Sequence, residues 1–409
     1  MRLLKRVYDR LGFHKAPPGT FLFAVHLLVH SLYRQTRRVP VDRGASGSDP
    51  VDPDVLVAFK VSGGIGDHLI AARYVRDLLA AVGDFKFDVY SPRPEVARWV
   101  FSEFPQFGDS YDDCFSWELR HREYPLALWI MSFVVAMTAS ARWHRVRRSH
   151  RRLIDVCAAI ERFKPQVDVC IAHHPRFDGL LGQIATFKNL DRYTLAHAMS
   201  GIEYGGSRLS LRRDDRALAR FELQGRHYVT IHNGFDSMEA NHVGPGSRAT
   251  KCYPRFDELV ALVRREFPNA AIVQLGTKTS QPIDGVHLNL IGRTSLSETA
   301  AIIAQSQLHI DNEGGLVHLA RCLDVQSCVV FGPTSVDYFA YEENINIRPT
   351  FCGGCWWITG DWLKRCPRDY EAPRCLTEQS PATILRAIAP RLAEIFPPTQ
   401  AERSLSRAA

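Results

Sequence analysis

The sequence has 409 residues, of which 45% are hydrophobic and 23% are charged, a size typical of two or three domains and a composition typical of a globular protein. Its longest apolar stretch near the N-terminus, residues 21–29, is far shorter than the roughly 20 residues that span a bilayer, which excludes a polytopic membrane protein. The net charge of +7 is concentrated in residues 1–50 and in the arginine-rich residues 142–152. Such patches suit a membrane surface, a nucleic acid or a phosphorylated substrate, and a solvated helix face is the alternative interpretation.

Residues 1–50 are predicted to form a basic extension of their own. Apolar residues recur there at helical spacing between basic residues, so this amphipathic helix either lies on an anionic membrane or packs on the main domain. No small-residue cleavage site follows the apolar segment, and six scattered cysteines lie partly within apolar runs. We therefore expect a cytoplasmic protein, with peripheral contact at the inner face of a bacterial inner membrane as an extension of that expectation.

Residues 51–218 are predicted to form a first Rossmann-like domain. A buried strand over 55–61, a glycine-rich turn over 62–67 and a helix over 69–82 open a βαβ unit. Further strands are expected at 86–90 and 167–172, and the pattern between them assigns no elements.

Residues 219–395 are predicted to form a second Rossmann-like domain, followed by a tail over 396–409. Strands and helices alternate along it: strands at 227–232, 271–275, 308–311 and 327–331, and helices at 256–267, 295–305 and 315–323. Ser295 and Glu298 form a capping box at the start of one helix. The alternation predicts an α/β protein of the GT-B type, whose two parallel sheets face a central cleft.

The first motif with chemical content is the turn at residues 62–67. It is neither the dinucleotide fingerprint nor a Walker loop, because the glycine spacing differs and no Walker lysine follows. Gly64 and Gly66 would let a ligand approach the backbone at a helix N-terminus, which favours anions. Asp67 either serves as a general base or caps the helix.

Two further motifs follow strands of the second domain and therefore lie at one edge of its sheet. Both suit phosphate or ribose, although His318 can equally be a packed histidine and Lys251 a surface lysine. The candidate residues of one motif are Asn233, Gly234 and Lys251. Those of the other are Glu313, Gly314, Gly315, His318 and Thr334.

Over residues 55–390 these motifs resemble glycosyltransferase family 9, the ADP-heptose:lipopolysaccharide heptosyltransferases, which have the GT-B fold. The family's Gly-Asp turn looks like residues 60–69, which makes Asp67 the catalytic base. Its phosphate-binding lysine looks like Lys251, its diphosphate element looks like residues 313–319, and its Phe-Gly-Pro-Thr turn looks like residues 331–334. Glu313 stands where the family more usually has Asp.

The resemblance implies inverting transfer of heptose from ADP-heptose to a hydroxyl of a lipopolysaccharide core, O-antigen or capsule glycan, with no cofactor in catalysis. The departing diphosphate would be stabilised by Lys251, Thr334 and the backbone amides of residues 233–234 and 314–315. The implied partners are a nucleotide-sugar donor and a glycan or glycolipid, not nucleic acid, and a homo-oligomer is an open alternative. A non-catalytic protein that binds polyanions or membranes is the rival interpretation, and the missing dinucleotide fingerprint argues against an oxidoreductase.

Four clustered cysteines, Cys352, Cys355, Cys366 and Cys375, have spacings that suit a closed tetrahedral site for structural zinc or iron, with disulfides or free thiols as the alternative. The cluster at residues 352–375 resembles the iron-binding finger of heptosyltransferases that modify autotransporter proteins. Transfer of heptose to an autotransporter adhesin is therefore an alternative acceptor reaction. Trp356, Trp357 and Trp362 are expected to pack over the site, with contact to an acceptor sugar as the alternative.

Overall fold

The computed structural model describes residues 54–234 and 249–397. The predicted N-terminal extension and most of the predicted tail thus lie outside the described residues. The description below concerns the unit formed by residues 51–409. Among its described residues, no helix is both long enough and apolar enough to cross a membrane.

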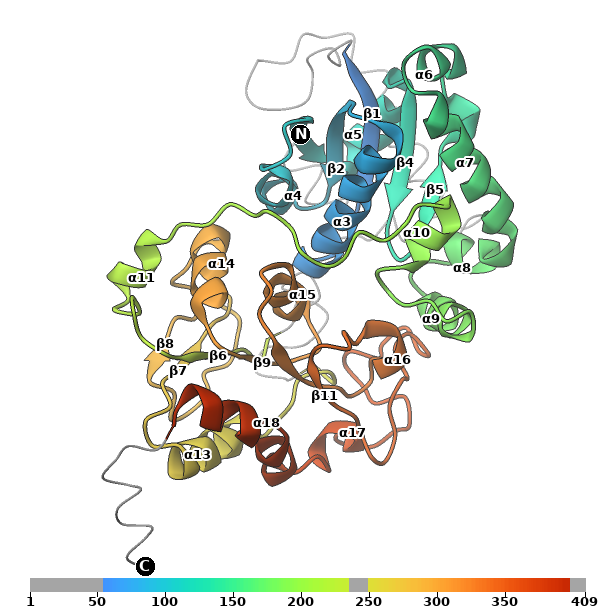
Figure 1. The fold of residues 1–409 in the computed structure, drawn as a ribbon. Helices are drawn as coiled ribbons and strands as arrows, with labels where there is room; N and C mark the ends of the chain where they lie inside the picture. Colours follow the sequence, from blue (N-terminus) through green and yellow to red (C-terminus); the bar gives the residue numbers. More distant parts are fainter. Residues whose placement is uncertain (1–53, 235–248, 398–409) are drawn as a thin grey trace, which may run out of the picture. The chain divides into compact units, whose positions relative to one another are not determined.

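The first sheet, to which the strands labelled β2, β1, β4 and β5 in Figure 1 belong, has the strand order β3-β2-β1-β4-β5. All neighbours are parallel except β4 and β5. This is the order in which two crossovers start from the central strand in opposite directions, as in Rossmann folds. The strands are β1 (Val55–Val61), β2 (Lys86–Ser91), β3 (Phe107–Asp112), β4 (Leu126–Ile130) and β5 (Val134–Ala136).

The second sheet is fully parallel, with the order β11-β10-β9-β6-β7-β8. In chain order of its own strands this is again the Rossmann arrangement, with the direction reversing between β6 and β9. The strands are β6 (Val229–Ile231), β7 (Ile272–Gln274), β8 (Leu288–Asn289), β9 (His309–Asn312), β10 (Ser327–Val330) and β11 (Ile345–Ile347). The prediction of an α/β protein with parallel sheets is confirmed.

Helices connect these strands. Those associated with the first sheet are α3 (Ile65–Val82), α4 (Pro94–Phe101), α5 (Asp113–Arg120), α6 (Trp143–Ser149), α7 (Arg151–Phe163), α8 (Asp168–Ala172), α9 (Asp178–Phe187) and α10 (Leu195–Ser200). Those that follow are α11 (Arg216–Arg220), α13 (Phe256–Glu266), α14 (Leu296–Gln305), α15 (Gly315–Cys322), α16 (Val336–Phe339), α17 (Arg374–Thr377) and α18 (Pro381–Ile395). Short 3-10 turns occupy His121–Glu123, Thr138–Ser140 and Lys164–Gln166.

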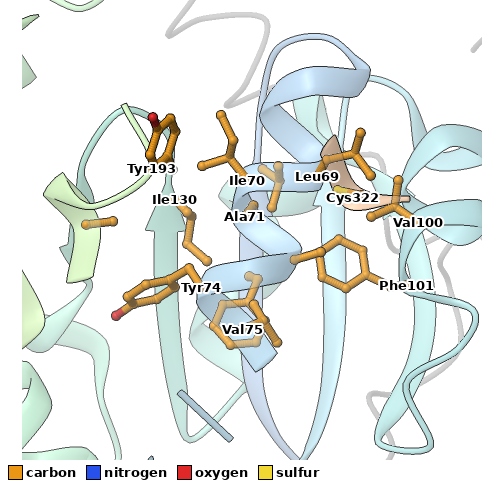
Figure 2. Close-up of a cluster of buried hydrophobic side chains, with 14 of the residues drawn as sticks. Leu69, Ile70, Ala71, Tyr74, Val75, Val100, Phe101, Ile130, Tyr193 and Cys322 are labelled. Carbon is orange, nitrogen blue, oxygen red and sulfur yellow. The ribbon is translucent and has the colours of Figure 1, made fainter. Parts of the chain in front are cut away.

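Burial on both faces explains the apolar strands. Six of the seven β1 residues are buried, and α3 packs its apolar side chains on this sheet together with α4 (Figure 2). In the second sheet, Ile272 and Cys328 contact the core shared with α13 and α18, while Val273 and Val329 belong to the core that contains α14 and α15. Parallel strands covered on both faces read as continuous apolar runs, which is why they could be recognised.

The strand expected at residues 167–172 is wrong, because this segment forms the helix α8. A short apolar run does not distinguish a strand from a helical turn, and here the preceding helix α7 and its 3-10 extension bring the chain in with helical backbone. Helix α3 also begins four residues earlier than expected, at Ile65. The capping box at Ser295 and Glu298 is confirmed.

The arginine cluster at residues 142–152 lies on α6 and α7. Val146 and Leu153 point into the core, whereas Arg147, Arg148 and Arg151 are exposed. The pattern is that of two amphipathic helices with a solvated basic face, and a role for that face in binding a polyanion stays a prediction.

Candidate active site

Asp67 lies in the first turn of α3, immediately beyond the carboxyl end of β1. The turn places it three residues after Gly64, whose backbone N–H donates to Asp67 Oδ2 at 2.8 Å. Asp67 thus accepts from the backbone N–H of the N-cap residue, as the acidic residue of a capping box does, and is not itself the residue that begins the helix. The Gly64 amide is thereby engaged with Asp67.

The second oxygen of Asp67 pairs with Arg192, a residue that the motifs did not indicate. Arg192 Nη2 donates to Asp67 Oδ1, and Arg192 Nη1 donates to the carbonyl of Met131, just after β4. The Arg192 side chain is buried, whereas 31% of the Asp67 side chain is exposed. The two residues are 125 positions apart in the chain, and no local pattern marks Arg192, so only the folded structure could identify it.

These contacts keep Asp67 ionised. Burial by itself would raise the pKa of this carboxyl, but Arg192 and the Gly64 amide lower it. A carboxylate has about four lone-pair positions, so two hydrogen bonds still leave it able to accept a proton.

The second sheet contributes an ion pair at its own carboxyl edge. Lys251 Nζ lies 3.3 Å from Oε2 of Glu313, the residue that follows β9. Burial would lower the pKa of Lys251, but the Glu313 carboxylate raises it. The ammonium is therefore charged, and 17% of the lysine side chain is exposed.

His318 joins the two groups of residues. Its Nε2 lies 3.9 Å from Glu313 Oε1, and its ring packs directly against Gly66 of α3, where a Cβ would collide with it. Gly315 makes the reciprocal contact, since a Cβ there would overlap Ile65. Gly66 and Gly315 thus allow α3 and α15 to touch at their N-terminal turns. The central cleft between the two sheets stays a prediction.

The turn after β6 is arranged differently from the prediction. The Gly234 amide donates to His232 Nε2 at 3.2 Å, and His232 Nδ1 lies 2.9 Å from Asp311 Oδ2. The Gly234 carbonyl accepts from Asn312 Nδ2. The backbone N–H and the backbone carbonyl of Gly234 are therefore both engaged within the protein, and the structure gives no free Gly234 N–H for a diphosphate.

The remaining predicted residues are placed as follows. Asn233 is 8% exposed and its Oδ1 has no hydrogen-bond partner among the described residues. Gly314 begins α15 as its N-cap. Thr334 is buried after β10, and no hydrogen bond of the described part of the chain joins it to Lys251, Glu313 or His318.

The four clustered cysteines are brought together. Cys352, Cys355, Cys366 and Cys375 all line one small cavity, with Cys366 and Cys375 buried. The donor set fits zinc or iron, but across residues 54–234 and 249–397 no three His, Cys, Asp or Glu side chains are arranged to hold a metal ion. As placed here, the sulfur atoms do not form a closed tetrahedral site.

The tryptophans of this segment pack beside the cavity rather than over it. Trp362 is buried with Cys252 and Leu363 and contacts Trp357. Trp356 instead packs on Tyr338 and Phe339 of α16.

Taken together, an ionised carboxylate at the end of the first sheet lies near a half-buried lysine, a neutral histidine and the start of α15 at the end of the second. Such a set can accept a proton from a hydroxyl and can stabilise negative charge on a departing group. Both halves lie where the strand order of their sheet reverses, the usual place for a ligand in open α/β sheets.

The chain was compared with known proteins. Residues 193–350 match the family model of glycosyltransferase family 9 (heptosyltransferase). No curated protein matches the sequence significantly.

Two solved structures share the fold. The ADP-heptose lipopolysaccharide heptosyltransferase II of E. coli is 14% identical, with 83% of this chain and 99% of that chain covered and a TM-score of 0.50. The dodecameric iron-containing heptosyltransferase TibC of enterotoxigenic E. coli, in complex with ADP-D-β-D-heptose, is 12% identical, with 87% of this chain and 82% of that chain covered and a TM-score of 0.54. At these identities the likeness concerns the fold, which is GT-B-like. With the match of the family model over residues 193–350, the chain carries a glycosyltransferase family 9 domain, and the comparisons support a glycosyltransferase.

Proposed function

We propose that this glycosyltransferase transfers heptose from ADP-heptose to a hydroxyl of a cell-surface glycan, such as a lipopolysaccharide core, O-antigen or capsule. The reaction inverts the anomeric centre and is metal-independent, with Asp67 as general base. The placement of Asp67 near the Lys251–Glu313 pair, through the contact of Gly66 with His318, carries this proposal.

The chemistry follows from these positions. An acceptor hydroxyl is a poor nucleophile, and the Asp67 carboxylate removes its proton as the new glycosidic bond forms. The bond between the anomeric carbon and the diphosphate breaks at the same time, and the departing diphosphate carries the electron pair. Lys251 and the first amides of α15 supply positive charge to it.

A protein acceptor is the second candidate. Two observations favour it: the fold likeness to TibC, which is an iron-containing heptosyltransferase, and the four cysteines gathered around one cavity. In this variant of the proposal the acceptor hydroxyl belongs to an autotransporter adhesin.

The same cysteines are proposed to hold a structural zinc or iron ion once their thiolates converge on it. Four thiolates leave no open coordination position, so the ion would stabilise residues 352–375 and take no part in the transfer. We also propose a cytoplasmic location, with peripheral membrane contact through the basic residues 1–50, and self-association as in the dodecameric TibC.

The catalytic proposal is tested with Asp67→Asn and Asp67→Ala. Both should lower kcat with ADP-heptose by about 10²- to 10⁴-fold, the usual contribution of a general base, while the affinity for ADP changes little. Asp337→Asn, which removes a surface carboxylate paired with Arg348, is the control and should keep native turnover. Near-native turnover of Asp67→Ala would refute the assignment of the base. An acceptor screen with truncated glycans and adhesin fragments separates the two acceptor classes.

A further inference from the structure

Arg73 of α3 is a fully buried cation without a carboxylate partner among the described residues. Its guanidinium donates to the Tyr341 hydroxyl at 2.6 Å, to the His318 carbonyl at 3.2 Å and to Cys322 Sγ at 3.0 Å. It also lies over the Tyr341 ring, 5.4 Å from the centroid. Because a buried charge is costly unless it is well paired, this arrangement needs an explanation.

The Tyr341 hydroxyl lies between Arg73 and His318. Tyr341 is 1% exposed, its ring stacks on Tyr193 with centroids 4.5 Å apart, and its oxygen is 2.7 Å from His318 Nδ1. Arginine can only donate hydrogen bonds, so it occupies a lone pair of the Tyr341 oxygen. The hydroxyl hydrogen is then left to donate to His318 Nδ1.

This chain of donors determines the state of the imidazole. With Nδ1 accepting, the neutral ring carries its proton on Nε2. Protonation of both nitrogens is disfavoured, since burial, with Arg73, Arg192 and Lys251 nearby, lowers the pKa of His318 to about 3, although Asp67 acts in the opposite direction. Arg73 also holds the backbone carbonyl of His318, so the ring's position and its tautomer depend on the same residue.

The resulting Nε2–H has no acceptor among the described residues. Glu313 Oε1, at 3.9 Å, lies beyond hydrogen-bond distance, and Glu313 Oε2 is engaged with Lys251. This Nε2–H group thus lies near Lys251, which is half-buried and charged, and near the start of α15, where an anionic group would be most stable.

We infer that Arg73 and Tyr341 are positioning residues that hold His318 as the Nε2–H tautomer, so that this N–H donates to a diphosphate oxygen of the nucleotide-sugar donor. The inference rests on the proposed function, because it concerns the same donor. Arg73 belongs to α3, whereas Tyr341 and His318 belong to the second sheet's half of the chain. The hydrogen-bonded chain therefore forms only when α3 and α15 are in contact.

The tautomer can be measured directly. In protein labelled with ¹⁵N-histidine, the imidazole resonances that disappear in His318→Gln belong to His318. At neutral pH they should show a neutral ring protonated on Nε2, and Tyr341→Phe should populate the Nδ1–H form as well. A native His318 that is protonated on Nδ1, or on both nitrogens, would overturn the inference.

Kinetics test the consequence. Tyr341→Phe should lower kcat by on the order of ten- to a hundredfold, the usual effect of losing a partner that orients a functional histidine. His318→Gln should retain more activity than His318→Asn, because the glutamine amide reaches the Nε2 position and the asparagine amide reaches only Nδ1. Adding Tyr341→Phe to His318→Gln should cost no further activity, since glutamine has no tautomer to select. An additive further loss would contradict the inference.

Tyr193→Phe is the matched control. It removes the hydroxyl of the tyrosine stacked on Tyr341, whose own partner is the carbonyl of Ala340, and it leaves the bond to His318 in place. It should lower Tm as Tyr341→Phe does but leave kcat close to native. Equal losses of kcat in both variants would show that Tyr341 acts only through packing and would contradict the inference.

Titration with ADP separates this inference from the proposed function. If ADP shifts the Nε2–H resonance of His318 while ADP-heptose is not turned over, the inference stands and the identity of the donor sugar is wrong. If Asp67→Asn abolishes transfer but ADP leaves that resonance unchanged, the proposed function stands and the inference fails.

Discussion

At the scale of single residues, two contacts of Asp67 both favour its ionised form. The Gly64 amide and Arg192 each stabilise the carboxylate, so its pKa lies below the ordinary range although burial opposes ionisation. A base of low pKa is weak, but it is fully ionised at neutral pH and it is held in one orientation. Arg192 therefore lowers the basicity of Asp67 but fixes the orientation of its carboxylate.

This balance predicts a pH dependence. Only the ionised carboxylate accepts a proton, so kcat/KM should fall as the pH drops through the lowered pKa of Asp67, below the ordinary value of about 4. Arg192→Met removes the largest influence that lowers this pKa, and the acid limb should move to higher pH, whereas Arg192→Lys keeps a positive charge and should move it less. Superimposable pH profiles of native enzyme and Arg192→Met would show that Arg192 does not control the base.

At the scale of elements, the turn between β1 and α3 depends on one glycine conformation. Gly63 has φ of +95°, in the region that favours glycine, and a Cβ at this position would overlap Asp67 Oδ2. The turn can thus deliver Asp67 only when residue 63 lacks a side chain. The glycines of this motif therefore leave room for the Asp67 side chain and for the contact of α3 with α15. Among the described residues, the structure gives them no phosphate-binding loop in the first sheet.

Gly63→Ala tests this reading of the turn. The left-handed backbone should cost about 1–2 kcal/mol of unfolding free energy, and the overlap with Asp67 should also lower kcat at least tenfold. Gly206→Ala is matched to it, with φ of +91° and no atom within 4 Å of the added Cβ. Denaturant unfolding should show a lower free energy of unfolding in both variants. Initial rates should show a lower kcat only in Gly63→Ala. Unchanged turnover of Gly63→Ala would mean that the turn tolerates a side chain.

At the scale of the whole molecule, both sheets reverse their strand order at the strands that carry the candidate residues. Asp67 follows β1 next to β4, and Glu313 follows β9 next to β6. A ligand that uses both edges requires the two halves of the chain together, so neither half alone is expected to be active. The cysteine segment attaches to the second half near Lys251, because Trp362 accepts a hydrogen bond from Thr250 through its carbonyl.

The proposed metal at Cys352, Cys355, Cys366 and Cys375 is therefore expected to matter for stability more than for chemistry. Elemental analysis should find roughly one zinc or iron per chain, and Cys375→Ser should lower both the metal content and Tm. Cys157→Ser changes a buried thiol outside the cavity and should leave the metal content unchanged. Metal-free native protein whose Tm does not respond to a chelator would refute the metal site.

The sequence by itself determined the alternation of strands and helices, because strands buried on both faces and capped amphipathic helices leave local patterns. Asp67, Lys251, Glu313 and His318 could be singled out for the same reason, since they adjoin glycine turns at strand ends. Only the tertiary structure decided that α8 is a helix, that the Gly234 amide is already bound by His232, and that Arg192, Arg73 and Tyr341 reach the site. The bonds of Arg192 to Asp67 and of Arg73 to Tyr341 join residues more than a hundred positions apart, so they depend on how elements pack, and no local pattern in the chain records that packing.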